Sequence, residues 1–335
     1  MKKVITVLLV VLFACGMVLT SGQLAAEEPW SDIQDESFDL VVGFDAGGSH
    51  DLSARYLQEA LAEETGIDID VVNMPGGIGT EAGYHVSTQD PDENIMFWGH
   101  PPAVVFDPAT EDVGYTYDDL DPVAAVGTPT FVLAAGEDAP FDTLDELIEY
   151  IEENPGEVVV GSQGELHLMH YAIEFILPMD ELDYNYVALA GGADVQSNLA
   201  GGHIDVGHMS MAAAKPLHDA GDLTAMVHTS EVAENIEMMP DVPHVSEYGI
   251  EFTEPHYLAA WSPAGTDREK REALNAAMEQ ATQNEEFQEN MEEMGFIIEH
   301  NTVDETEELF GEYYHEELLP GYVEWLEEAR EERGN

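Results

Sequence analysis

Basic residues are scarce in this chain. Only 9 of its 335 residues are lysine or arginine, against 70 aspartates and glutamates, so the formal net charge is -61. Such a surface repels nucleic acids and anionic membranes at ordinary salt, which excludes proteins that bind along phosphate backbones. Self-repulsion on this scale is tolerable when salt shortens the screening length to about 3 Å near 1 M. We therefore expect an acidic, exported protein of a halophile, with no nucleic-acid partner.

Cysteine is also nearly absent, since the chain contains only Cys15. It lies in an apolar run from Val4 to Thr20, which follows two lysines and precedes small residues, as in an export signal cleaved near Ala26. We predict a signal peptide over residues 1–26 and a mature chain without disulfides, periplasmic or on the extracellular face of the membrane. The alternative is a lipid anchor at Cys15, because "LFAC" resembles a lipobox. No later apolar run is long enough to span a bilayer.

Hydrophobic residues nevertheless make up 44% of the chain, enough for a folded core. Apolar runs of strand length alternate with helical patterns, which predicts an α/β architecture with mainly parallel sheets flanked by helices. The length suits two lobes, and no Gly/Ser-rich or Pro-rich linker separates them. We therefore expect the chain to cross between the lobes more than once, through Pro122–Gly127 and Thr224–Ser230, which would form the hinge.

A glycine-containing loop follows the first predicted strand, in "VVGFDAGGSHDLSARYLQEAL". A strand that ends near Phe44 and a helix that begins near Asp51 bring free N–H groups and the positive end of a helix to one point, where a carboxylate or phosphate binds. Gly47 and Gly48 let the backbone approach a ligand closely, and Ser49 adds a hydroxyl group. Asp51 is able to cap its own helix. The alternative is an ordinary turn between a strand and a helix.

The stretch "EVVVGSQGELHLMH" (residues 157–170) repeats this order of strand, glycine-containing loop and helix. Ser162, Gly164 and His167 are its small or polar members, although a lone histidine is more often a structural residue. Ligands of α/β proteins collect at the carboxyl ends of strands. Two such loops, one in each half of the chain, therefore predict a ligand site between them.

Motifs of other function classes are weak or incomplete. The glycines of "GGIGTEAG" resemble a dinucleotide-binding turn, but no acidic residue stands at the ribose position, and a tight turn before a helix is the simpler interpretation. No glycine loop carries a Walker lysine, and no serine lies in a G-x-S-x-G motif. His203 and His208 flank a predicted strand and would meet a metal only by chance. We expect no cofactor, no metal and no enzymatic activity, with a periplasmic enzyme acting on a carboxylate as the alternative.

The two loops belong to a longer resemblance. "GFDAGGSHDLSARYLQEALAEETG" followed by "VVNMPGGIGTEAG" is similar to the amino-terminal signature of the extracytoplasmic solute-binding receptors of tripartite tricarboxylate transporters, of the TctC/Bug type. The similarity continues through "ENPGEVVVGS", "VALAGGADVQSNLAGGHIDVGHMS" and "WSPAGT". It implies a two-lobed type 2 periplasmic-binding-protein fold that closes on a small organic acid and delivers it to membrane permease subunits. We expect a monomer; a ligand-sensing receptor of a signalling system is the alternative.

The resemblance also implies which residues bind the ligand. One carboxylate is held by the two loops, partly through backbone groups and water. By position these residues are Phe44, Asp45, Ala46, Gly47, Gly48, Ser49 and Asp51 in the first loop and Ser162, Gly164 and His167 in the second, and the predicted set also includes His100, Gly191 and Gly192. The predicted lobes are residues 27–125 with 229–335, and residues 126–228.

Three departures from the family pattern bear on the ligand. Asp45 replaces the usual proline of the first loop. The second loop is short, which leaves open whether His167 or His170 faces the ligand. Leu189–Gly192 replaces a Tyr-Lys-Gly-Gly stretch, so the family's lysine is missing. A hydrogen bond from an N–H group to a charged acceptor is worth about 1.5 to 3 kcal/mol, so we expect the backbone to hold the acid.

Overall fold

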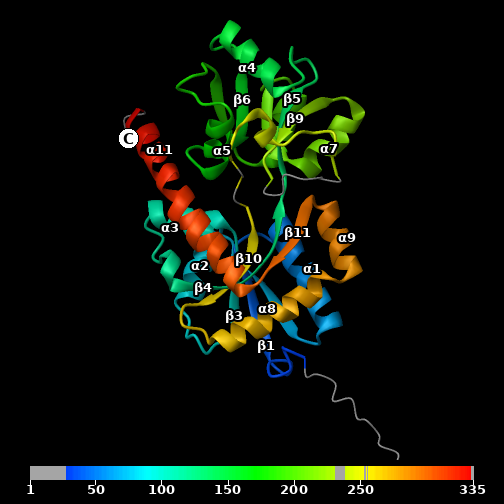
Figure 1. Ribbon diagram of the computed structural model, residues 1–335, viewed down its shortest axis with the longest axis vertical. Coiled ribbons are helices and arrows are strands. Elements are labelled where there is room, and N and C mark those ends of the chain that lie inside the picture. Colours follow the sequence, from blue (N-terminus) through cyan, green and yellow to red (C-terminus); the bar gives the residue numbers. More distant parts are fainter. Residues whose placement is uncertain (1–27, 231–237, 253, 255, 333–335) are drawn as a thin grey trace, which may run out of the picture.

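Two β-sheets form the framework of the protein (Figure 1). The structure is a computed structural model that describes residues 28–230, 238–252, 254 and 256–332. Sheet A lies in lobe 1 and sheet B in lobe 2, and helices cover both faces of each sheet. The predicted two-lobed α/β fold is therefore confirmed. The predicted signal peptide, with Cys15, lies outside the described residues.

Sheet A has the strand order β11-β4-β10-β3-β1-β2. In β1, Leu40 and Val42 pack with α1, α8 and α9, whereas Val41 packs with α2 and the carboxyl-terminal helices, because alternate residues of a strand face opposite sides. The strands of sheet A are β1 (Ser37–Val42), β2 (Asp68–Asn73), β3 (Ile95–Gly99), β4 (Leu120–Pro129), β10 (Leu258–Pro263) and β11 (Phe296–Asn301). Its α-helices are α1 (Ser49–Glu64), α2 (Thr80–Ser87), α3 (Asp107–Thr110), α8 (Arg268–Thr282), α9 (Glu285–Glu293), α10 (Val303–Glu307) and α11 (Leu319–Glu332). The 3-10 helices η1 (Gly77–Gly79) and η3 (Tyr117–Asp119) and the π-helices η2 (Pro102–Phe106) and η5 (Glu308–Leu318) complete this lobe.

Sheet B has the strand order β7-β6-β8-β5-β9. Its strands are β5 (Phe131–Gly136), β6 (Val159–Gln163), β7 (Asn185–Leu189), β8 (Val206–Ser210) and β9 (Leu223–His228). Helices α4 (Leu144–Glu153) and α5 (Leu168–Ile176) cover one face, and α6 (Gly192–Ala200) and α7 (Met211–Ala220) cover the other. Within the described ranges, no helix combines the length and apolar character that a bilayer crossing requires.

Both sheets are mixed. The neighbours β1, β2 and β3 are parallel, as are β6, β7 and β8, but β10 and β11 run against their partners in sheet A, and β5 runs against its partners in sheet B. Of the nine strand pairs in the described part of the chain, four are parallel, which corrects the expectation of mainly parallel sheets. Each antiparallel pair contains β4, β5 or β10, which are strands next to the passages between the lobes.

The chain passes from sheet A to sheet B between β4 and β5, at Thr130. Its N–H donates to the carbonyl of Gly295 in lobe 1 (3.1 Å), and its carbonyl accepts from the N–H of Met211 in lobe 2 (2.8 Å). The predicted hinge segment Pro122–Gly127 lies wholly inside β4, so the passage falls just beyond it. The other predicted segment, Thr224–Ser230, covers most of β9, from which the chain returns to β10.

A third connection is made by α11, which reaches from lobe 1 toward lobe 2 (Figure 1). The rings of Tyr322 and Trp325 on α11 lie 5.3 and 5.2 Å from the ring of Tyr171 on α5. Tyr171 belongs to the same buried cluster as Val41 and Phe97 of sheet A. The carboxyl-terminal helix therefore joins the two lobes by apolar contact.

The segment after β9 packs on lobe 2. Met239 and Val242 share a core with Val132 of β5, and Val245 shares a core with Leu133 on the other face of sheet B. The predicted boundary at residue 228 places this segment in lobe 1. We propose instead that lobe 2 extends to about residue 250, because Ile250 still packs on the core of lobe 2.

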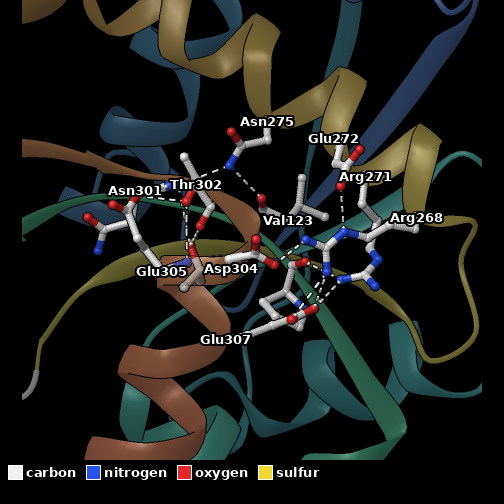
Figure 2. A network of polar contacts seen from close by, with 12 residues as sticks. Val123, Arg268, Arg271, Glu272, Asn275, Asn301, Thr302, Asp304, Glu305 and Glu307 are labelled. Carbon is white, nitrogen blue, oxygen red and sulfur yellow. Dashed lines mark hydrogen bonds and ion pairs between the residues drawn. The ribbon is translucent and has the colours of Figure 1, made fainter.

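A polar network connects α8 to β4, the strand from which the chain passes to lobe 2 (Figure 2). The Asn275 amide donates to the carbonyls of Val123 in β4 (2.8 Å) and Asn301 in β11 (2.9 Å). One turn away, Arg271 donates to Glu307 and to the carbonyl of Pro122. The network therefore positions the start of the passage between the lobes.

We predict that Asn275→Ala lowers the free energy of unfolding by about 2 to 3 kcal/mol, because two buried carbonyls lose a donor. Chemical denaturation measures this change. Asn290→Ala on the neighbouring helix α9 is the matched control and should change stability by less than about 0.5 kcal/mol. Equal values for the two variants would contradict the anchoring role of Asn275.

Candidate functional site

The first loop connects β1 to α1 and is shaped by the carboxylate of Asp51. The N–H of Gly47 donates to Asp51 Oδ2 (2.7 Å), and the Asn73 amide donates to Asp51 Oδ1 (2.9 Å) and to the carbonyl of Phe44 (3.0 Å). Arg55 forms an ion pair with Asp51 at 2.8 Å. The carboxylate thus ties the loop to its own helix and to the end of β2.

These contacts keep Asp51 ionised. Burial raises its pKa, but hydrogen bonds from Arg55, Gly47 and Asn73 outweigh burial and lower it. Its oxygens already accept hydrogen bonds from Gly47, Arg55 and Asn73. We therefore propose that Asp51 does not contact the ligand but holds the first loop in the conformation that binds it. Helix α1 begins at Ser49, and its N-cap residue is Gly48, so the expectation that Asp51 caps the helix is wrong.

The rest of the first loop faces solvent, and its exposed residues are Asp45, Ala46, Gly47, Gly48 and Ser49. The first N–H groups of an α-helix have no acceptor inside the helix. Helix α1 is 16 residues long and has the positive end of its dipole at this loop. The exposed end of α1 is therefore able to receive an anion.

Phe44 and two histidines form an aromatic group beside this helix end. The Phe44 ring stacks on His50 at 4.0 Å and meets His100 edge-on at 5.4 Å, and the two histidine rings are 5.0 Å apart. A Cβ on Gly79 would lie 3.6 Å from both Phe44 and His100, and the φ of +99° there favours glycine. The Gly76–Gly83 stretch thus forms a tight turn under this group, as its simpler interpretation predicted.

The second loop connects β6 to α5. The Ser162 hydroxyl is buried and lies 2.7 Å from the Tyr186 hydroxyl, which donates to the carbonyl of Gly164 (2.6 Å). His170 stacks on Tyr186 at 3.5 Å, whereas His167 occupies the N-cap position of α5 and interacts electrostatically with His100 of lobe 1. His167 is therefore the histidine on the side of the first loop.

A third helix end lies beside the second loop. β7 is the parallel neighbour of β6, so the loops that follow the two strands emerge at the same edge of sheet B. Gly191 is the N-cap residue of α6 and has an extended backbone, with nothing within 4 Å of an added Cβ. A Cβ on Gly192 would lie 3.3 Å from the side chain of Gln163. The open backbone at Gly191 leaves the N-terminus of α6 accessible.

A buried carboxylate lies on the return from lobe 2 to lobe 1. Glu254 Oε2 accepts from the Thr229 hydroxyl (2.8 Å) and lies 2.9 Å from His208 Nε2, while Oε1 lies 3.2 Å from His256 Nε2. Burial raises the pKa of Glu254, but His208 and His256 outweigh it and hold the pKa well below its usual range. Glu254 therefore links β8 to the segment that precedes β10.

Histidines from both lobes converge around these groups. Burial is the main cause that lowers the pKa of His50 to about 3, of His167 to about 4, and of His100 well below its usual value. Electrostatic interaction with His256 lowers all three further. No lysine or arginine contributes to these shifts. The three imidazoles are therefore neutral at pH 7.

Each of these neutral rings has a buried nitrogen that lacks a partner within the described part of the chain: His50 Nε2, His100 Nδ1 and His167 Nε2. Buried polar atoms normally have partners, so these atoms indicate a place for a ligand. In the same ranges, no group of three His, Cys, Asp or Glu residues is placed to hold a metal ion.

His100 and His167 were predicted from the sequence, whereas His50, Glu254 and His256 were not. His50 lies directly after the predicted glycine loop, and that position was the available signal. Glu254 and His256 carry no motif, and only the folded chain brings them to the site. The other predicted residues lie in the three loops described above.

Two lobes joined by two strand passages, with a helix that begins at a glycine-containing loop in each lobe, have the architecture of a two-lobed solute-binding protein. The match to the tripartite tricarboxylate transporter family receptors spans residues 53–314. The chain therefore belongs to this family, and it is a solute-binding receptor of that type. The match begins two residues after Asp51, so it includes the second and third loops and starts just beyond the first.

Three known proteins illustrate the similarity. The "UPF0065 protein in gbd 5'region" of Cupriavidus necator is 26% identical over 255 residues, which cover 75% of this chain and 76% of that protein. A TctC solute binding protein from Polaromonas has a TM-score of 0.74 at 21% identity, covering 86% of this chain and 98% of its own. An R. palustris protein solved with adipate has a TM-score of 0.68 at 21% identity, covering 90% and 98%. These structures share the fold.

We predict that His50 makes stability depend on pH. Its pKa is lowered in the folded protein, so the unfolded chain binds the proton first, and stability that is full above about pH 6.5 is lost as pH falls toward about 3. Between about pH 7 and pH 5, the free energy of unfolding should fall by about 1 to 2 kcal/mol less in the His50→Gln variant than in the wild type. Chemical denaturation at each pH measures it.

The control is His203→Gln, at an exposed turn residue, which should follow the wild-type pH dependence. The quantity compared is the slope of the free energy of unfolding against pH. The acidic surface contributes equally to this slope in the wild type and both variants, so its effect cancels in the comparison. A His50→Gln slope equal to that of the wild type would show that His50 is not held neutral.

Proposed function

We propose that this receptor captures a small organic acid between its lobes and delivers it to the permease subunits of a tripartite tricarboxylate-type transporter. One observation carries the proposal: the exposed N-terminus of α1 in lobe 1 and the N-termini of α5 and α6, which follow neighbouring strands of sheet B in lobe 2, each offer free N–H groups. Helix N-termini bind anions through free N–H groups and the helix dipole. A carboxylate is the anion that the family's transporters take up.

The distribution of positive charge supports binding by the backbone. Six lysines and arginines lie in the described residues, and five of them form ion pairs with carboxylates. Lys270 binds Asn94 and the carbonyl of Glu93. Arg55 lies next to the site, but its charge is matched by Asp51. An acid at the site is therefore held by N–H groups, which suit a charged acceptor at about 1.5 to 3 kcal/mol each.

Closure explains how binding leads to delivery. A ligand that contacts both lobes stabilises the closed form by its differential affinity for that form, and the permease then recognises the closed receptor. The residues for both sides are Phe44, Gly47, Gly48, Ser49 and His100 in lobe 1, and Ser162, Gly164, His167, Gly191 and Gly192 in lobe 2. Asp45 and Ala46 form the exposed rim of the first loop.

Family membership supports the remaining features of the proposal. We propose an exported monomer, with the signal peptide at residues 1–26 and without enzymatic activity, because the family consists of receptors. The structural relative solved with adipate gives a precedent for an acid ligand on this fold. Salt near the level that screens the acidic surface is the condition in which we expect binding to be strongest.

We predict that Gly48→Asp weakens acid binding at least about tenfold. Gly48 has φ −78°, and its Cβ position lies 3.4 Å from the carbonyl of Asp45, so a side chain fits. Aspartate is a favourable N-cap residue, so the fold remains stable while the new charge repels a carboxylate. Titration calorimetry in about 1 M salt measures the affinity.

Gly48→Asn is the matched control. Its side chain has the same shape and caps the helix equally well, but it carries no charge. Binding that is weakened equally by aspartate and asparagine would point to a steric effect. Unchanged affinity in both variants would contradict the assignment of the first loop to the site.

A further inference from the structure

The second loop, between β6 and α5, has a backbone conformation that is rarely adopted. Gly164 has φ +70° and Leu166 has φ +53°, so both residues lie in the left-handed region. Glycine adopts that region without strain, but a leucine there is strained and persists only where its surroundings fix it. The shape of this loop therefore depends on contacts from outside the loop.

Tyr186 of β7 provides the first of these contacts. Its hydroxyl lies 2.7 Å from the hydroxyl of Ser162 and donates to the carbonyl of Gly164 (2.6 Å). A single oxygen atom on the neighbouring parallel strand thus binds the residues on both sides of Gln163. The carbonyl of Leu189, at the end of the same strand, accepts from the N–H of Gly164 (3.0 Å). Strand β7 therefore holds the first half of the loop.

His170 of α5 provides the second contact. Its Nδ1 atom accepts from the N–H of Leu166, the strained residue (3.3 Å). The His170 ring is buried and stacks on the ring of Tyr186, with the ring centroids 3.5 Å apart and an angle of 4° between the planes. The two side chains that hold the loop therefore also hold each other.

Trp325 of α11 packs on this pair from the side of lobe 1. Its ring meets the ring of His170 edge-on, with the centroids 5.2 Å apart. Helix α11 is fixed to lobe 1 by the packing of Tyr322 on Phe106 and by the ion pair of Arg330 with Glu111. Contacts thus run from lobe 1 through Trp325 and His170 to the second loop of lobe 2.

We infer that Tyr186 and His170 position the second loop for the ligand, and that Trp325 supports them from lobe 1. The inference rests on the proposed function, because it takes the second loop as part of the ligand site. These residues act through the loop and not by touching the ligand. A loop that already has its binding conformation loses less entropy when a ligand binds, so removal of a positioning residue weakens binding.

The first test compares two tyrosines that each lose only a hydroxyl group. Tyr186→Phe releases the second loop, and Tyr184→Phe is the matched control. Both tyrosines pack in the same core of lobe 2, but the Tyr184 hydroxyl donates to the carbonyl of Leu177 at the opposite end of α5 (2.8 Å). Titration calorimetry with succinate, malate and adipate in about 1 M salt measures the affinities.

We expect acid binding to be about tenfold weaker in Tyr186→Phe and within about twofold of the wild type in Tyr184→Phe. Melting temperatures confirm that both variants are folded. Wild-type affinity in Tyr186→Phe would overturn the inference and leave the proposed function intact. A wild-type protein that binds none of the acids would contradict the proposed function.

Amide hydrogen exchange measures the loop itself and needs no ligand. Peptides that cover residues 161–170 should exchange at least about threefold faster in Tyr186→Phe than in the wild type, because the loop opens more often. The same peptides should be unchanged in Tyr184→Phe. Unchanged exchange in Tyr186→Phe would overturn the inference whether or not an acid binds.

A double variant tests the route from lobe 1. His170→Leu should weaken acid binding about tenfold and Trp325→Leu about threefold. The double variant should bind only as weakly as His170→Leu, because Trp325 then has no imidazole to support. Additive losses would show that Trp325 acts by another route, such as its contact with Tyr171, and would overturn its part in the inference.

Discussion

Negative charge has to be balanced, and this chain has little with which to balance it. Its 70 acidic residues face 9 basic ones, and three of the latter, Arg268, Lys270 and Arg271, lie together at the start of α8. There they bind acidic side chains, amides and carbonyls that fasten α8 to the rest of lobe 1. These basic side chains therefore stabilise the packing of α8 within lobe 1. Backbone N–H groups and neutral imidazoles are what remain for recognition, and both work best where water is excluded.

The first loop illustrates how a backbone site is kept in shape. Asp51 binds Gly47, Arg55 and Asn73, so its charge organises the loop while the helix end stays open. Gly43 and Gly79 touch so closely that a Cβ on Gly43 would lie 2.4 Å from the Gly79 Cα atom. This approach sets the turn on which Phe44 and His100 pack. A rigid loop of this kind loses little entropy when a ligand binds.

Communication between the lobes depends on a few local connections. Thr130 is hydrogen-bonded to both lobes, Glu254 joins β8 to the return segment, and α11 packs its aromatic residues on α5. Glu254 is also an electrostatic neighbour of His167. The same carboxylate therefore belongs to the connection between the lobes and to the surroundings of the proposed site.

The alternating pattern of strands and helices predicted the α/β architecture, and the two glycine loops predicted the helix N-termini of α1 and α5. These features are local, because side-chain periodicity and glycine conformation act over a few residues. Only the tertiary structure decided the direction of β5, β10 and β11 and the packing of Met239 to Val245 on sheet B. It also decided that His50, His167, Glu254 and His256 interact with one another. They depend on contacts between residues that are far apart in the chain, and burial, which sets the pKa values of these histidines, exists only after those contacts form.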